Sequence, residues 1–167
     1  MNGKVKTMVE PKIITKRAFK IIGSAFETTM AEKDVKVPRL VEEFHTKRIV
    51  EIENRVNAPV SYGVFIDPPN WNPETESFTW IAGVEVDSHD FLPSGMVART
   101  FPDQQYATLH FNPAEHEFDP YPFLHKWIKQ NGYEQIKGHG FELYEPYTGS
   151  QTAFILHLPV RETESRN

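Results

Sequence analysis

Residues 77–86 read SFTWIAGVEV, and apolar side chains recur there at every second position. In an extended chain, successive side chains point to opposite faces, so this run predicts a strand with one wholly apolar face. The apolar face consists of Phe78, Trp80, Ala82, Val84 and Val86, and the opposite face of Thr79, Ile81, Gly83 and Glu85. A strand of this kind needs a layer of packed side chains on at least one side.

The residues before this strand predict a helix between two further strands. Residues 60–66 form a short apolar run that stops at Asp67-Pro68-Pro69, because proline cannot continue a strand ladder. Upstream, Val37, Leu40, Val41 and Phe44 follow the spacing i, i+3, i+4, i+7 of a helix with one apolar stripe. Residues 12–22 mix β-branched and basic residues and predict the first strand.

The second half of the chain repeats this order. Residues 96–101 and 105–111 predict strands on either side of Pro102. Asp119 followed by Pro120 is typical of a helix start, and Asn131-Gly132 of a helix end. Two more strands are expected at 141–145 and 151–160.

Together these elements predict an α+β fold in one domain, residues 12–160. Two pseudo-symmetric βαββ units, about 12–90 and 95–160, would form an antiparallel sheet with helices on one face. A ligand groove is expected between the units. Residues 1–11 are interpreted as a flexible leader and residues 161–167 as a polar tail.

Composition excludes several classes of protein. The 167 residues include no cysteine, so disulfides, zinc–thiolate sites and a thiol nucleophile are ruled out. No window approaches 18 consecutive apolar residues, and no secretory signal precedes Pro11, so we expect a cytoplasmic protein without a membrane anchor. The net charge of −5 argues against direct binding of nucleic acid.

Known metal and cofactor motifs are missing from the sequence. The seven histidines form no HExxH motif and no i, i+4 pair on a predicted helix. Neither a phosphate-binding loop nor a GxSxG motif occurs, and no catalytic triad follows from the spacing. We therefore expect no metal and no cofactor.

Residues 138–145, GHGFELYE, place a carboxylate inside a short apolar strand. Glu142 alternates with Phe141 and Leu143 and shares a face with Tyr144. A carboxylate at a half-buried position is costly unless it is paired. Either this face is wet, or a basic residue such as Arg99 pairs with Glu142, or the anion is kept for a cationic or polar ligand.

Aromatic residues from several predicted elements could surround such an anion. Aromatic walls around one carboxylate would suit a flat lipophilic cation, through stacking and cation–π attraction. Aromatics at alternate strand positions can equally form plain core. The candidates are Tyr62, Phe65, Trp80, Tyr106, Trp127 and Tyr144.

Four stretches in the same order resemble the GyrI-like small-molecule-binding family, which shares its domain with effector-binding domains of AraC-type and MerR-type bacterial transcription regulators. They are residues 60–67 (VSYGVFID), 80–86 (WIAGVEV), 95–107 (GMVARTFPDQQYA), and 127–133 (WIKQNGY) followed by 141–144 (FELY). The resemblance implies two βαββ units related by a pseudo-twofold axis with a ligand groove between them. It also implies that Glu142 pairs with cationic drugs, with Tyr144 beside it; Tyr62, Trp80 and Tyr106 are predicted as further lining.

The resemblance leaves three functions open. The leading hypothesis is a stand-alone protein that captures a lipophilic, cationic small molecule around Glu142, because the domain leaves no room for a helix-turn-helix module. The second is a hydrolase of cyclopropanoid or other toxic compounds, with Glu142 as general base. The third is a modulator that binds a transcription factor or DNA gyrase.

Overall fold

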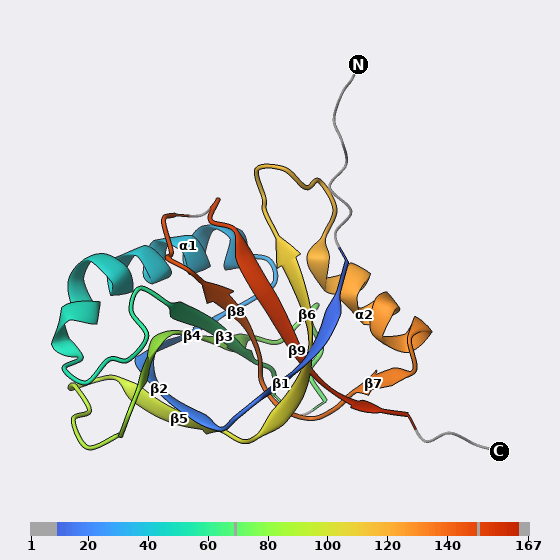
Figure 1. Cartoon of the computed structure of the whole chain (residues 1–167). Helices are drawn as coiled ribbons and strands as arrows, with labels where there is room; N and C mark the ends of the chain where they lie inside the picture. Colours follow the sequence, from blue (N-terminus) through green and yellow to red (C-terminus); the bar gives the residue numbers. More distant parts are fainter. Residues whose placement is uncertain (1–9, 69, 150, 164–167) are drawn as a thin grey trace.

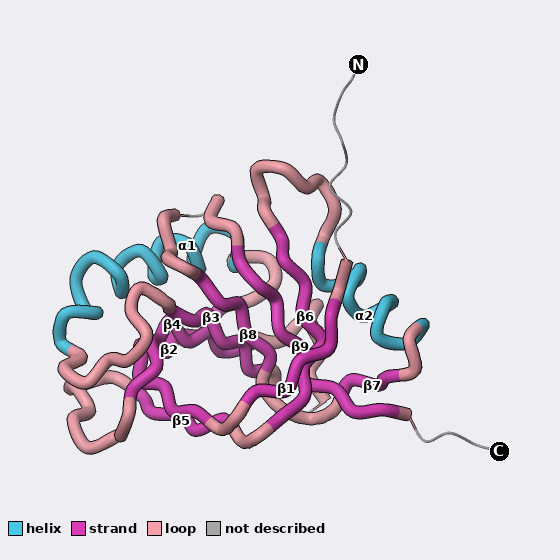
Figure 2. The backbone as a smooth tube through the Cα atoms, viewed as in Figure 1, coloured by secondary structure: helices cyan, strands magenta, loops and turns pink. Residues whose placement is uncertain are grey.

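A computed structural model describes residues 10–68, 70–149 and 151–163 and shows one mostly antiparallel sheet with two α-helices (Figures 1 and 2). The helices are α1 (Lys33–Glu43), which continues into a π-helical turn (Phe44–Arg48) and a 3-10 turn (Ile49–Glu51), and α2 (Pro120–Gln130). The strands are β1 (Lys12–Lys16), β2 (Phe19–Thr28), β3 (Ser61–Ile66), β4 (Phe78–Val86), β5 (Val97–Phe101), β6 (Gln104–Phe111), β7 (Tyr133–Gln135), β8 (Gly140–Tyr144) and β9 (Phe154–Glu162).

The order of strands across the sheet has pseudo-twofold symmetry about its centre. It runs β1-β6-β9-β8-β3-β4-β2-β5, with β7 added to the end of β9. The units β2-α1-β3-β4 and β6-α2-β8-β9 therefore occupy equivalent halves and meet where β3 pairs with β8. This arrangement confirms the predicted α+β fold with two βαββ units.

The edge strands are exchanged between the two units. β1 pairs with β6 of the second unit, whereas β5 pairs with β2 of the first. The crossing is fixed where the backbone N–H of Ala18 donates a hydrogen bond to Asp103 Oδ1 at 2.7 Å. The link from β1 to β2 and the link from β5 to β6 therefore each join the two halves. The sequence does not indicate this exchange of edge strands.

Both helices pack on the same face of the sheet, as predicted. Val41 and Phe44 lie with Ile22, Trp80 and Val84 in a core beneath α1. A second core forms beneath α2, and its buried members are Ala107, Leu109, Leu124, Ile128, Leu156, Leu158 and Val160. The strand at residues 78–86 puts its apolar face toward α1, in agreement with the alternation of its sequence.

The opposite face of the sheet is buried by its own curvature. Phe19 of β2 stacks on Phe101 of β5 with ring centroids 4.6 Å apart and meets Phe141 of β8 at 5.7 Å. Tyr106 of β6, from the other half, also packs against Phe141, at 5.2 Å. Side chains from distant strands can meet in this way only if the sheet bends around them.

Local signals at the second helix are confirmed, and the chain end differs. The side chain of Asp119 accepts a hydrogen bond from the backbone N–H of Tyr121 at 3.0 Å, and Gly132 adopts a φ of +80° after the helix. Strand β9 extends to Glu162 because β7 pairs with its last residues. The polar tail expected from residue 161 therefore starts inside a strand, and residues 1–9 of the leader expected at 1–11 lie outside the described residues.

We expect Gly63→Ala to lower the free energy of unfolding by about 1–3 kcal/mol, as overpacking does. A Cβ at Gly63 would lie 2.4 Å from Cζ2 of the buried Trp80, so the indole would have to move. Urea unfolding followed by circular dichroism measures the effect. In a Trp80→Phe background the cost should shrink; an equal cost in both backgrounds would contradict this explanation.

Acid should destabilise the fold through His157. This side chain is 3% exposed and stacks on Phe141, and burial lowers its pKa to about 4. In the unfolded chain this histidine is protonated below about pH 6.5, whereas in the folded protein it stays neutral down to about pH 4. The free energy of unfolding therefore falls as the pH drops from 6.5 toward 4, by up to about 3 kcal/mol. Urea titrations across this range should show a flatter pH dependence for His157→Phe than for His110→Phe, which changes an exposed histidine; equal slopes would exclude this role.

Candidate functional site

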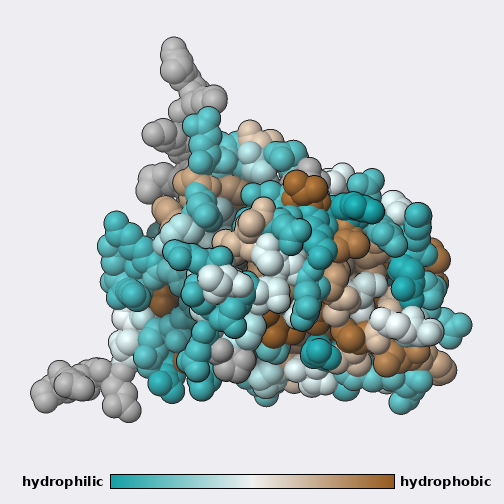
Figure 3. All heavy atoms as spheres, turned by 180° about the vertical axis from the view of Figure 1, so that it is seen from behind, coloured by the Kyte–Doolittle hydropathy of each residue, from teal (hydrophilic) through white to brown (hydrophobic). Residues whose placement is uncertain are grey.

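A cavity of about 810 Å³ lies between the two helices, above the strands where the units meet. Its floor comes from β3, β4 and β8, its walls from α1 and α2, and one side from the loop between β8 and β9. On the side of the molecule hidden in Figure 1, several apolar patches are exposed among polar side chains (Figure 3). The predicted groove between the units is therefore present.

Glu142 lies in the floor of this cavity at the middle of β8. Its side chain is 9% exposed, and its backbone pairs with Gly63 across the seam of the two units. Tyr144 donates its hydroxyl hydrogen to Oε1 of Glu142 at 2.5 Å, and Tyr121 donates to Oε2. Each carboxylate oxygen thus has one phenol donor, from β8 and from the first turn of α2.

Burial raises the pKa of Glu142, while the two phenol donors and the ammonium of Lys33 oppose that rise. The pKa values of Tyr121 and Tyr144 are raised well above their usual range, by burial and then by the adjacent carboxylate. Both phenols therefore stay protonated and act as donors. The pair of hydroxyls holds an anion in place without neutralising its charge.

Arg99, the basic partner considered for Glu142, lies elsewhere. Its guanidinium donates to the carbonyl of Ala98 on the edge strand β5. Among the residues that the structure describes, no ion pair involves Glu142. The interpretation of Glu142 as half of a salt bridge is therefore wrong, and the interpretation of a wet strand face is excluded by its burial.

Aromatic rings enclose the carboxylate. Trp80 of β4 lies over Gly63, and Phe65 of β3 lies 6.1 Å from it, centroid to centroid. Phe65 also meets Tyr121 at 5.4 Å, and Tyr147 meets Tyr144 at 5.2 Å. Trp71, Phe78, Phe111 and Phe154 complete the aromatic lining.

Three of the predicted site residues share the cavity, namely Glu142, Tyr144 and Trp80. Tyr62 and Tyr106 do not line it, since both point to the opposite face of the sheet. The hydroxyl of Tyr62 donates to Glu85 at 2.8 Å, and Tyr106 packs on Phe141. Tyr62 and Phe65 are an odd number of residues apart on β3, so strand alternation places their side chains on opposite faces of the sheet.

Sequence reasoning did not name Tyr121, Tyr147 or Trp71, and it listed Phe65 only among the aromatic residues that could surround the anion. Tyr121 shares a helix face with Leu124 and Ile128, which marks it as facing the sheet but not as facing Glu142. Tyr147 follows the end of β8 and is held by His45, whose ring stacks on it at 4.6 Å. Only the packing of the helices on the sheet brings these residues together.

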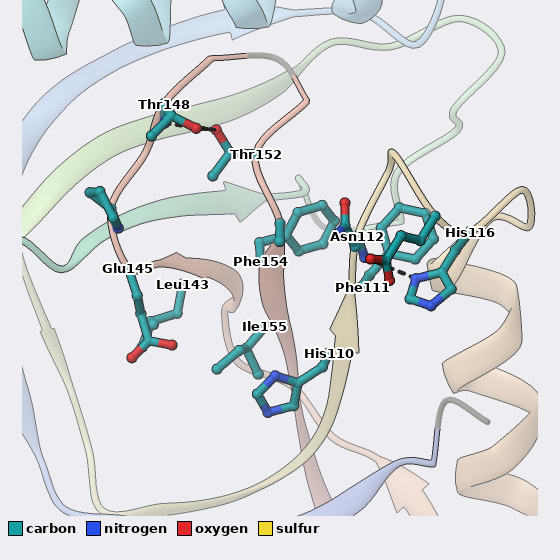
Figure 4. A pocket seen from close by; sticks show the side chains of 13 residues that line it. His110, Phe111, Asn112, His116, Leu143, Glu145, Thr148, Thr152, Phe154 and Ile155 are labelled. Carbon is teal, nitrogen blue, oxygen red and sulfur yellow. Dashed lines mark hydrogen bonds between the residues drawn. The ribbon is translucent and has the colours of Figure 1, made fainter. Parts of the chain in front are cut away.

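A smaller cavity of about 530 Å³ opens beside the ends of β6, β8 and β9 (Figure 4). His110, Glu145 and Ile155 line it, and Thr148 and Thr152 are hydrogen-bonded at its upper side. It shares Phe111, Thr152 and Phe154 with the larger cavity. Within the described part of the chain, no group of three or more potential metal ligands occurs.

Residues 9–153 match the model of the GyrI-like small-molecule-binding domain. The chain belongs to this family. Its cavity between two βαββ units is thus the cavity of a GyrI-like small-molecule-binding domain. A comparison with curated protein sequences gives no match. No helix among the described residues is long and apolar enough to cross a membrane.

Solved structures share the fold at low sequence identity. One is SAV2435 bound to tetraphenylphosphonium, with a TM-score of 0.67, 14% identity, and coverage of 91% of this chain and 94% of that one. Another is an integron cassette protein from the mobile metagenome of Vibrio cholerae (TM-score 0.60, 18% identity, coverage 90% and 95%). A hydrolase from Listeria innocua is more distant (TM-score 0.54, 12% identity, coverage 91% and 92%).

Removing a phenol donor should raise the pKa of Glu142 further. Tyr121→Phe deletes a hydrogen bond that stabilises the ionised carboxylate, so the proton should be held to higher pH. The carboxyl carbon resonance of Glu142, followed by NMR against pH, reports this directly. Tyr147→Phe, which removes a hydroxyl not bonded to Glu142, serves as the control; equal titration curves for the two variants would contradict the role of Tyr121.

Proposed function

We propose that this GyrI-like protein captures a lipophilic organic cation in the larger cavity, with Glu142 as the counter-charge. The observation that supports the proposal is a buried carboxylate with two neutral phenol donors and no ion pair among the described residues. Such an anion gains most from a ligand that brings a positive charge into the cavity.

The surroundings of Glu142 favour an organic cation over a small hydrated one. A hydrated ion would need several ligands at one point to replace its water, and no group of three or more His, Cys, Asp or Glu side chains that could hold a metal ion occurs among the described residues. A lipophilic cation instead buries apolar surface and meets the faces of Trp80, Phe65 and Tyr147. SAV2435, whose structure contains tetraphenylphosphonium, has the same fold and supports this class of ligand.

Lys33 is the cation in the cavity lining whose charge acts on Glu142. It lies at the start of α1, lines the cavity, and lowers the pKa of Glu142 through its charge. Its ammonium is also paired with Asp34 at 2.8 Å. A bound cation would be repelled by Lys33, which therefore limits affinity.

Hydrolysis of a strained small molecule is the second candidate. The raised pKa of Glu142 favours it, because a carboxylate whose pKa lies nearer neutrality is a better general base. The hydrolase from Listeria innocua shares the fold. Release of product from a reactive cyclopropyl compound, abolished in Glu142→Gln, would favour this candidate over capture alone. Binding to a transcription factor or gyrase stays a prediction.

Glu142→Gln should weaken binding of tetraphenylphosphonium by about 10- to 100-fold, the range expected for an interaction with a buried charge. Isothermal titration calorimetry measures the affinity, and the shift in melting temperature checks it independently. Glu145→Gln is the matched control, since Glu145 is exposed and lines the smaller cavity. Neutral triphenylphosphine oxide should bind both proteins alike; unchanged phosphonium affinity in Glu142→Gln would overturn the proposal.

Lys33→Gln should strengthen binding of the same cation by a few-fold, because it removes the positive charge nearest the bound ligand. The gain should shrink as salt is raised from 50 to 500 mM, since the Lys33 side chain reaches the cavity mouth. Lys129→Gln, on the far end of α2, should change nothing. Weaker binding in Lys33→Gln would contradict the assigned repulsion.

A further inference from the structure

The larger cavity contains a second acidic position at some distance from Glu142. Four carboxylates line it, together with Lys33 and His125. Asp34 is paired with Lys33, and Asp119 caps α2 by accepting from the N–H of Tyr121. Asp67 makes no hydrogen bond or ion pair with the residues that the structure describes.

Asp67 follows directly on β3 and extends the cavity face of that strand. Gly63, Phe65 and Asp67 alternate onto one side, and Gly63 is the backbone partner of Glu142. Four residues of extended chain span roughly 13 Å, so the strand positions of Glu142 and Asp67 are about that far apart along the floor. Phe65 occupies the floor between them.

An aromatic ring stands beside Asp67, as rings do beside Glu142. Ile66 pairs with Thr79, which puts Phe78 next to the strand position of Asp67. Trp71 packs edge-on against Phe78 with centroids 5.6 Å apart and lines the cavity. Its indole N–H is already donated to the carbonyl of Glu76, which leaves the ring itself for contact with a ligand.

Among the described residues, no cationic side chain forms an ion pair with Asp67. His139 is the group whose charge would act on it most. Burial and the nearby Arg99 lower the pKa of His139, so its imidazole is neutral at pH 7. Lys33, the lysine that lines the cavity, forms an ion pair with Asp34.

We infer that the cavity takes elongated dications, with one positive centre at Glu142 and the second at Asp67 beside Trp71, joined by an apolar spacer over Phe65. The inference rests on the proposed capture of an organic cation by Glu142 and specifies the class of ligand. A carboxylate next to an indole is a suitable receptor for a quaternary ammonium group. The spacer must cover about 13 Å, the span of the strand between the two positions.

The test compares decamethonium, which carries two trimethylammonium groups on a ten-carbon chain, with decyltrimethylammonium, which carries one. By isothermal titration calorimetry, the dication should bind the wild-type protein about 10-fold more tightly, given a partly exposed ion pair plus a cation–π contact. Shortening the spacer to hexamethonium should remove most of this advantage.

Variants separate the two ends of the site. Asp67→Asn should reduce decamethonium binding to the level of decyltrimethylammonium and leave the monocation within two-fold of wild type. Asp90→Asn is the control and should change neither affinity, since Asp90 is an exposed carboxylate that lines neither cavity. Glu142→Gln should weaken both ligands.

The outcomes distinguish this inference from the proposed function. If decyltrimethylammonium and tetraphenylphosphonium bind through Glu142 but decamethonium binds no more tightly, the second subsite is refuted and cation capture stands. A decamethonium affinity that is unchanged in Asp67→Asn, or equal losses for both ligands in that variant, also overturns the inference. If none of the three cations binds the wild-type protein, the proposed function itself fails.

Discussion

A carboxylate lies at the seam where two structural units join, and the surrounding structure buries it and gives it two phenol donors. Glu142 lies opposite Gly63, and the indole of Trp80 reaches across from β4 to lie over that glycine. The absence of a side chain at Gly63 therefore lets a large aromatic ring cover the strand next to the anion. The helix α2 then contributes Tyr121 from above, and β8 contributes Tyr144.

The exchange of edge strands ties the two units together on both sides of this seam. Because β1 joins β6 and β5 joins β2, neither unit has its full set of strands without the other. The aromatic core on the far face, where Phe19, Tyr106 and Phe141 meet, fixes the bend of the sheet beneath the cavity. The helices on the near face are thereby held apart at the distance that leaves a cavity between them.

Much of this architecture follows from local patterns in the sequence. Alternation correctly assigns the two faces of residues 78–86 and places Glu142 with Tyr144, and the cap at Asp119 marks the start of α2. What local patterns do not give is the relative phase of separate strands. Tyr62 and Tyr106 are aromatic and on the right strands, yet each is one position away from the cavity face. Tyr121 and Trp71 reach the site only through long-range packing, and strand exchange depends on a crossing between segments 85 residues apart.

The central claim is that Glu142 is the counter-charge of a bound organic cation, and a crystal structure with tetraphenylphosphonium tests it most directly. The phosphorus should lie between the two helices, facing the carboxylate of Glu142, with phenyl rings against Trp80 and Tyr147. A phosphonium bound in the smaller cavity beside His110 and Glu145, or on the outer surface with the larger cavity empty, would contradict it.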